Sequence, residues 1–107
     1  MKYYVRLTED AENDLLDIHA YVATNDSPEK ADRLLDKLEA VCCALADLPS
    51  RGHAPPELAP TGLRQYLEIH LKPYRILYEI AGRYVYLLAV WNGRRDVSAL
   101  LERRLMR

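Results

Sequence analysis

The chain has 107 residues, half of them hydrophobic, and a formal net charge of −1. This length favours a single domain over residues 1–107, and no apolar run is long enough to cross a membrane. The only cysteines, Cys42 and Cys43, are adjacent, which excludes an intramolecular disulfide framework and a cysteine cluster for a metal. Because the N-terminus lacks a signal-peptide apolar segment, we expect a cytoplasmic protein, with no cofactor and no metal.

The charges are distributed unevenly along the chain. Residues 1–60 carry six basic and twelve acidic side chains, whereas residues 61–107 carry nine basic and four acidic ones. Such asymmetry is typical of a protein whose basic face meets an acidic partner. The alternative is that the opposite charges pair across the surface of the domain itself.

The first half of the chain predicts a strand followed by two helices. Residues 2–7 alternate in the manner of a short strand. Thr8 is a suitable N-cap for a helix that extends to about Ala23, with an apolar residue at every third or fourth position. Ser27 and Pro28 are typical of a second helix start, and this helix is expected to end at Leu48, before Pro49.

The second half predicts an irregular loop, three strands and a short helix. Residues 49–62 contain four prolines and two glycines, which favours an irregular loop. Three alternating segments follow, at 63–72, 73–80 and 84–91, and their short links predict an antiparallel meander. The turn length at Gly82 decides which face Tyr84 and Tyr86 occupy, and the sequence leaves this open. Asp96 or Ser98 is expected to cap a last helix through Leu105.

This β-α-α-β-β-β order with a short C-terminal helix predicts an α+β fold, in which a helical hairpin packs on one face of an antiparallel sheet. The apolar stripes of the two helices should pack against Ile76 and its strand neighbours. The residues expected in this contact are Leu15, Ile18, Leu34, Leu38, Val41 and Leu45.

Several short motifs, in order along nearly the whole chain, resemble the RelE/ParE toxin superfamily, and in particular its ParE-like plasmid-stabilisation branch. These motifs are Leu7-Thr8 with Ala11, Asp14-Leu15 with Ile18 and Tyr21, Leu48-Pro49-Ser50-Arg51-Gly52, Pro56-Glu57-Leu58, Pro73-Tyr74-Arg75-Ile76 with Tyr78, and Gly93-Arg94-Arg95-Asp96.

The resemblance implies the toxin of a type II toxin–antitoxin system. Its partner would be a cognate antitoxin, either ParD-like or another small DNA-binding protein, whose C-terminal segment folds onto the toxin. ParE members poison DNA gyrase, whereas RelE-type relatives cleave ribosome-bound mRNA. On the gyrase interpretation the chain is not an enzyme and does not bind DNA directly on its own.

Arginines are the candidate target-binding residues. Arg75, Arg94 and Arg95 match arginines that the superfamily keeps at these places, and Arg64 adds a further positive charge. The alternative for Arg75 is an ion pair with Glu68 or Glu79. The alternative for Arg94 and Arg95 is a salt bridge, for example to Asp96.

A nuclease would need an acid, a base and a cation for the developing phosphorane charge. His70, Arg75 and Glu68 are the candidates, since His70 shares a face with Arg75 if the turn at Pro73 is tight. His19 and His53 are expected on the surface. The chain has few lysines, a pI of about 6.3 and no histidine or tyrosine in its tail, and these features disfavour a ribonuclease.

Overall fold

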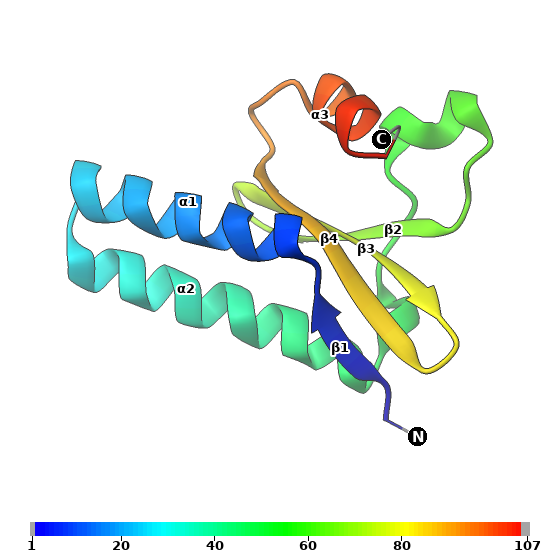
Figure 1. Ribbon diagram of the computed structural model, residues 1–107, viewed down its shortest axis with the longest axis horizontal. Helices are drawn as coiled ribbons and strands as arrows, with labels where there is room; N and C mark the ends of the chain where they lie inside the picture. Colours follow the sequence, from blue (N-terminus) through cyan, green and yellow to red (C-terminus); the bar gives the residue numbers. More distant parts are fainter. Residues whose placement is uncertain (1, 106–107) are drawn as a thin grey trace.

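The computed structural model describes residues 2–105 and has the predicted order of elements (Figure 1). Within these residues, no helix is both long and apolar enough to cross a bilayer. The strands are β1 (Tyr4–Leu7), β2 (Tyr66–Leu71), β3 (Tyr74–Ala81) and β4 (Tyr84–Asn92). The helices are α1 (Glu9–Asn25), α2 (Pro28–Cys43) and α3 (Val97–Leu105), and short 3₁₀ turns occupy Ala44–Ala46, Pro49–Arg51 and Pro56–Thr61.

Both long helices begin at the predicted caps. The Thr8 side chain accepts a hydrogen bond from the Ala11 amide at 3.2 Å, and Ser27 accepts one from Lys30 at 3.2 Å. The prediction that α2 extends to Leu48 is wrong, because the α-helix ends at Cys43 and a 3₁₀ turn follows. The 3₁₀ turn nevertheless buries Leu45 completely, so the apolar pattern continues beyond the end of the α-helix.

The sheet has the strand order β1-β4-β3-β2. As predicted, β2, β3 and β4 form an antiparallel meander. β1 lies at the edge and pairs in parallel with β4, from Tyr4 opposite Tyr84 to Leu7 opposite Leu87, so the whole sheet is mixed. The parallel direction follows because the helical hairpin and the meander, rather than a tight turn, connect β1 to β4.

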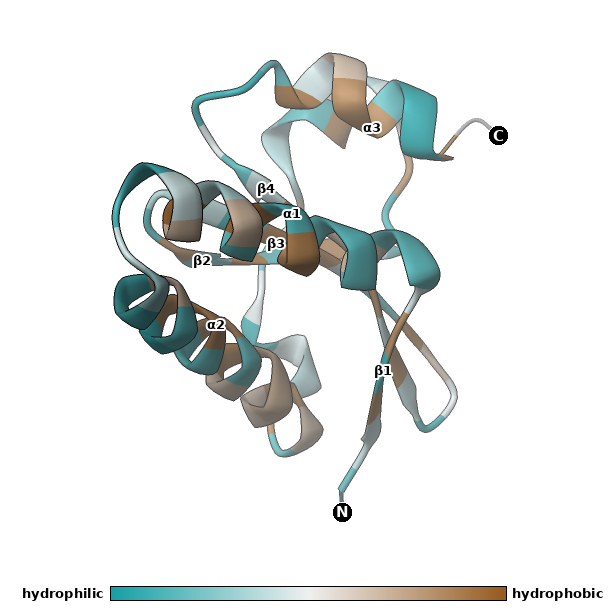
Figure 2. Cartoon of the chain, turned by 60° about the vertical axis from the view of Figure 1, so that its left-hand side comes forward, coloured by the Kyte–Doolittle hydropathy of each residue, from teal (hydrophilic) through white to brown (hydrophobic). Residues whose placement is uncertain are grey.

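The α1–α2 hairpin covers one face of the sheet, and the expected core is confirmed (Figure 1). Ile76 and Tyr78 of β3 are fully buried beneath Leu38 and Leu45. Of the six predicted helix residues, three are buried in this cluster and three are partly buried against it: Leu15, Leu38 and Leu45, and Ile18, Leu34 and Val41. Figure 2 shows hydrophobic and hydrophilic residues alternating along both helices, the pattern of an amphipathic surface helix.

The opposite face has a smaller second core, which the sequence did not reveal. It joins α3 and the 3₁₀ turn Pro56–Thr61 to β3 and β4 through Leu58, Leu77, Ala89, Trp91, Val97 and Leu101. Arg104 ties α3 to α1, since its Nη1 donates to Asp14 Oδ2 at 3.0 Å and to the Leu88 carbonyl at 2.9 Å. Its guanidinium also lies 5.0 Å from the centroid of the Trp91 ring.

The face of Tyr84 and Tyr86 is settled by the β3–β4 turn. Ala81 pairs with Tyr84, so the turn has two residues, and Gly82 adopts a φ of 61° that favours glycine. Both tyrosines therefore lie on the face away from the hairpin, where their rings stack with centroids 5.8 Å apart. Tyr4 of β1 joins them, with its centroid 5.6 Å from that of Tyr84.

Candidate functional site

Five polar side chains meet on the face opposite the helical hairpin, and we call this group the Glu68 cluster. Glu68 and His70 are two residues apart on β2 and so share a face of the sheet. Arg75 is the direct cross-strand neighbour of His70 on β3. His53 belongs to the loop before β2 and forms an isolated β-bridge with Glu68. Glu57 lies in the first turn of the 3₁₀ segment Pro56–Thr61. The cluster therefore joins two strands to the proline-rich loop.

Arg75 makes the strongest contacts in the cluster. Its Nη1 and Nη2 each donate to one oxygen of Glu57 at 2.6 Å, which is a bidentate pair. Its Nε and Nη2 also donate to Glu68 Oε2, at 3.0 and 2.6 Å. Only 16% of the Arg75 side chain is exposed. Arg75 thus holds the loop, β2 and β3 together, and most of its donors are already used.

The second oxygen of Glu68 faces the two histidines. His70 Nε2 lies 2.8 Å and His53 Nε2 lies 3.1 Å from Glu68 Oε1. The imidazole centroids are 5.1 Å apart, with the rings edge to face. The Glu68 side chain is only 4% exposed, whereas His53 and His70 are 58% and 43% exposed. One buried carboxylate therefore positions two solvent-accessible imidazoles.

The charges of the cluster are not balanced. The hydrogen bonds from Arg75 lower the pKa of the Glu57 carboxyl, while burial opposes this shift. The same pairing, with Glu57 as its largest cause, raises the pKa of Arg75. Counted by formal charge, with neutral imidazoles, two carboxylates and one guanidinium give the group one net negative charge.

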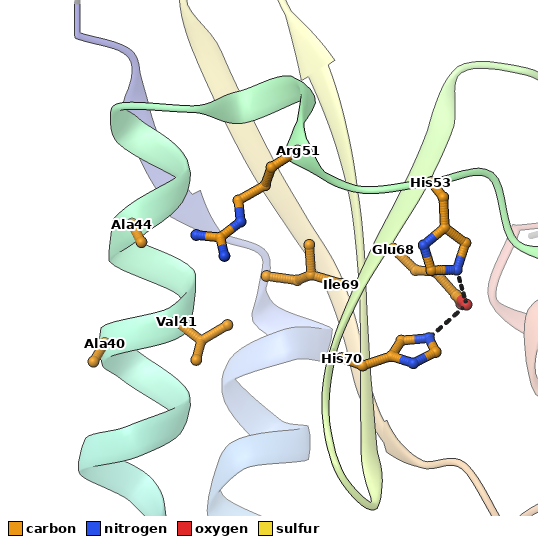
Figure 3. Close-up of a pocket in the computed structure, with 8 residues that line it drawn as sticks. All are labelled: Ala40, Val41, Ala44, Arg51, His53, Glu68, Ile69 and His70. Carbon is orange, nitrogen blue, oxygen red and sulfur yellow. Dashed lines mark hydrogen bonds and ion pairs between the residues drawn. The ribbon is translucent and has the colours of Figure 1, made fainter.

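A groove of about 510 Å³ opens beside the two histidines (Figure 3). Ala40 and Val41 of α2 and Ala44 of the following 3₁₀ turn form one wall, and residues 68–70 of β2 form the other. Arg51 lies across the groove from His53 and His70 in Figure 3, where both imidazoles point to the same Glu68 oxygen. The groove therefore has an apolar wall on the hairpin side and a polar end at Arg51 and the Glu68 cluster.

The structure brings together the three residues named for a nuclease, Glu68, His70 and Arg75. The sequence analysis missed two members of the cluster. His53 was expected on the surface, and the proline-rich loop has no periodicity that would have placed it. Glu57 was noted only within a motif. Of the two carboxylates weighed for Arg75, the structure pairs it with Glu68.

The other candidate arginines lie outside the cluster. Arg94 and Arg95 occupy the exposed link between β4 and α3, and Arg64 occupies the exposed link before β2. Within residues 2–105, neither Arg94 nor Arg95 has an ion-pair partner. Asp96, the partner considered for them, instead accepts a hydrogen bond from the Ala99 amide at 3.1 Å and so caps α3.

Solved structures from toxin–antitoxin systems share this fold. The chromosomal ParDE system of P. aeruginosa contains a chain with a TM-score of 0.71 and 17% identity, over 85% of this chain and 96% of that one. A chain of the RelBE2 toxin–antitoxin complex from Mycobacterium tuberculosis has a TM-score of 0.63 and 23% identity, over 86% of this chain and 99% of that one. A double arginine-to-alanine mutant of E. coli toxin RelE in the free state has a TM-score of 0.66 and 15% identity, over 100% of this chain and 98% of that one. At these identities the likeness concerns the fold alone.

The sequence comparisons are more specific. The family described as "ParE toxin of type II toxin-antitoxin system, parDE" matches residues 5–97. Toxin ParE3 of Caulobacter vibrioides is 29% identical over 97 residues, which cover 91% of this chain and 93% of that protein. The chain belongs to the ParE toxin family of type II toxin–antitoxin systems.

Proposed function

We propose that this toxin acts by binding and poisoning DNA gyrase, that it has no catalytic residues of its own, and that a ParD-like antitoxin neutralises it. The pairing of Arg75 with Glu57 and Glu68 supports the absence of catalytic residues, and so favours binding over RNA cleavage. A ribonuclease of this superfamily would need a cation free to meet the developing phosphorane charge. Here the central guanidinium is committed to two carboxylates, and the cluster as a whole is negative, which repels a phosphate backbone.

The exposed pair Arg94 and Arg95 supports contact with a macromolecular target. Both arginines extend from the link between β4 and α3, and Arg95 also lines a groove of about 350 Å³ with Tyr21, Tyr74 and Trp91. Unpaired arginines beside aromatic side chains are typical of the residues that contribute most to protein–protein binding. We therefore assign target contact to Arg94 and Arg95 first, with Arg64 and Arg75 in lesser roles.

Surface features of the hairpin support the antitoxin part of the proposal. Leu16 and Tyr21 of α1 are 66% and 69% exposed, and the groove between the hairpin and β2 has an apolar wall. An amphipathic segment that lies along the hairpin and the outer edge of the sheet at β2 would cover both surfaces. The ParDE and RelBE2 structures named above are toxin–antitoxin systems of this same fold. Burial of about 1,600 Å² would be typical of such a complex.

One observation favours the ribonuclease as the second candidate. Glu68 holds His70 at 2.8 Å, which is a suitable arrangement for a general base, and His70 is partly exposed. Replacing His70 with glutamine separates the two candidates. If RNA cleavage is the function, His70→Gln should reduce the rate by roughly 10²–10⁴-fold, whereas gyrase poisoning should continue because no proton is moved.

The complementary variant is the double charge reversal Arg94→Glu/Arg95→Glu. We expect it to abolish growth arrest on induced expression and to abolish trapped DNA cleavage by purified gyrase on supercoiled DNA, because like charges then face each other at the contact. Arg33→Glu/Lys37→Glu, on the exposed side of α2, is the matched control and should retain toxicity. Melting curves verify that each variant is folded. Full toxicity of a folded Arg94→Glu/Arg95→Glu protein, or mRNA cleavage by the parent in a translation reaction, would contradict the proposal.

A further inference from the structure

We propose that His53, Glu68 and His70 form a binding site for a divalent transition-metal ion, with Zn²⁺ as the best match. The donor atoms His53 Nε2, Glu68 Oε1 and His70 Nε2 all lie within 4.8 Å of one another. This inference goes beyond the proposed function and does not depend on it. No local spacing pattern predicts this site, because His53 is fifteen residues from Glu68 along the chain.

Two of the three donor separations are close to those of a metal site. The two imidazole nitrogens lie 3.1 and 2.8 Å from Glu68 Oε1. Four ligands at zinc distances of about 2.0–2.1 Å in a tetrahedron are separated from one another by about 3.3 Å. Each histidine would therefore retreat from the carboxylate by a few tenths of an ångström. The two imidazole nitrogens, which lie within 4.8 Å of each other, would move to that same separation of about 3.3 Å. Both rings are partly exposed, so water or another ligand can complete the coordination.

The charge of the cluster favours a cation at this place. Arg75 forms its bidentate pair with Glu57, and these two charges offset each other. The buried Glu68 carboxylate then remains the net negative charge, and its Oε1 faces only the two histidines. Arg75 binds Glu68 through Oε2 and so fixes the carboxylate with Oε1 directed to the imidazoles. Such outer hydrogen bonds orient the ligands in established metal sites.

The donor set selects the class of metal. Two imidazoles and one carboxylate suit Zn²⁺, Co²⁺ and Ni²⁺, whereas Mg²⁺ and Ca²⁺ prefer oxygen donors throughout. Binding would also join the loop before β2 to β2 itself, because His53 comes from the former and Glu68 and His70 from the latter. A bound metal would occupy His70 Nε2, so the same nitrogen could not serve as a general base.

The test is calorimetric titration of ZnCl₂ into the full-length, chelator-treated chain, with melting curves in parallel. All proteins carry Cys43→Ser, because Cys43 is exposed and its thiol could bind zinc. Cys42 is retained, because its thiolate does not form at neutral pH. Burial, as the largest cause, raises the pKa of the Cys42 thiol to about 12. We expect one Zn²⁺ per chain, and a rise in melting temperature on the order of 10 °C at a hundredfold excess over Kd. MgCl₂ should give neither effect.

Variants identify the ligands. The double variant His53→Ala/His70→Ala should bind Zn²⁺ more than about 100-fold more weakly and lose the zinc-dependent rise in melting temperature. His19→Ala is the matched control, because His19 Nε2 also contacts a carboxylate, Asp32 Oδ1 at 2.7 Å, but has no second imidazole beside it. Absence of zinc binding in the parent would show that the group is a hydrogen-bonded cluster only. Undiminished binding in the double variant, or an equal loss in His19→Ala, would likewise overturn the proposal.

Discussion

Replacing Arg75 with methionine tests whether this arginine is chiefly a structural link. Methionine keeps much of the side-chain volume but removes every hydrogen bond to Glu57 and Glu68. Glu57 is 23% exposed and can turn to water. Glu68 is only 4% exposed, so its carboxylate would stay buried without a cationic partner other than the histidines.

The expected loss of stability is large. Removing one member of a buried ion pair typically costs about 3–5 kcal/mol, because the remaining charge is desolvated and uncompensated. For a domain of this size, that loss corresponds to a fall in melting temperature of roughly 15–30 °C. Urea denaturation followed by circular dichroism gives the free energy of unfolding. Parent and variant can be compared if this free energy falls with urea concentration at the same slope in both.

A second substitution separates the charge effect from a packing effect. In Arg75→Met/Glu68→Gln a neutral amide replaces the buried carboxylate that has lost its partner. This double variant should therefore be more stable than Arg75→Met alone. Arg33→Met, at an exposed position on α2, is the control and should change stability by less than about 0.5 kcal/mol. If Arg75→Met unfolded within about 0.5 kcal/mol of the parent, the central place given to Arg75 in holding loop, β2 and β3 together would be refuted.

Three further predictions concern stability. Leu38 is fully buried between the hairpin and the sheet, so Leu38→Ala should cost about 2–5 kcal/mol in urea denaturation, and a smaller change would contradict the helix-on-sheet core. Tyr78 donates to the Pro49 carbonyl at 2.7 Å and accepts from the Gly52 amide at 3.0 Å, so Tyr78→Phe should cost about 1–3 kcal/mol, whereas Tyr21→Phe on the surface should cost almost nothing. Because the pKa of Glu57 is lower in the folded than in the unfolded chain, its contribution is complete above the ordinary value of 4.5 and is lost as pH falls through the folded value. The stability difference between the parent and Glu57→Gln should therefore shrink below pH 4.5, and a difference independent of pH would exclude this linkage.

The sequence predicted those parts of the site that follow from strand periodicity. Glu68 and His70 are two residues apart on one strand, so they share a face, and a tight turn places Arg75 opposite His70. The proline-rich loop has no such period. Its path is fixed by contacts from residues distant in the sequence, among them Tyr78, whose hydroxyl bonds to Pro49 and Gly52. His53 was therefore out of reach of sequence reasoning.

The same distinction explains the outcome for the helices. Local signals, the N-cap residues and the apolar stripes, located α1 and α2 within a few residues at their starts. The end of α2 depended on tertiary contacts, since the Tyr3 amide donates to the Ala46 carbonyl at 2.8 Å in the 3₁₀ turn. The position of α3 depended on Arg104, whose partner Asp14 is ninety residues away in the sequence. Periodicity reports a helix's apolar side but not which of two sheet faces it will cover.

The contrast between Arg75 and the pair Arg94 and Arg95 has a structural origin in the link after β4. The Gly93 amide donates to the Pro73 carbonyl at 2.7 Å, which docks this link on the β2–β3 turn. A Cβ at position 93 would lie 3.1 Å from that carbonyl and 3.2 Å from Arg75 Cδ, so glycine permits the close approach. Asn92 and Asp96 then use their side-chain oxygens on the amides of Arg94 and Ala99, rather than on a guanidinium. The side chains of Asn92 and Asp96 thus bond to the backbone, and within residues 2–105 both exposed arginines have no ion pair. Arg75, on the neighbouring strand, is instead paired with two carboxylates. This division explains why charge reversal at Arg94 and Arg95 probes binding, while substitution of Arg75 or Gly93 would first disturb the scaffold.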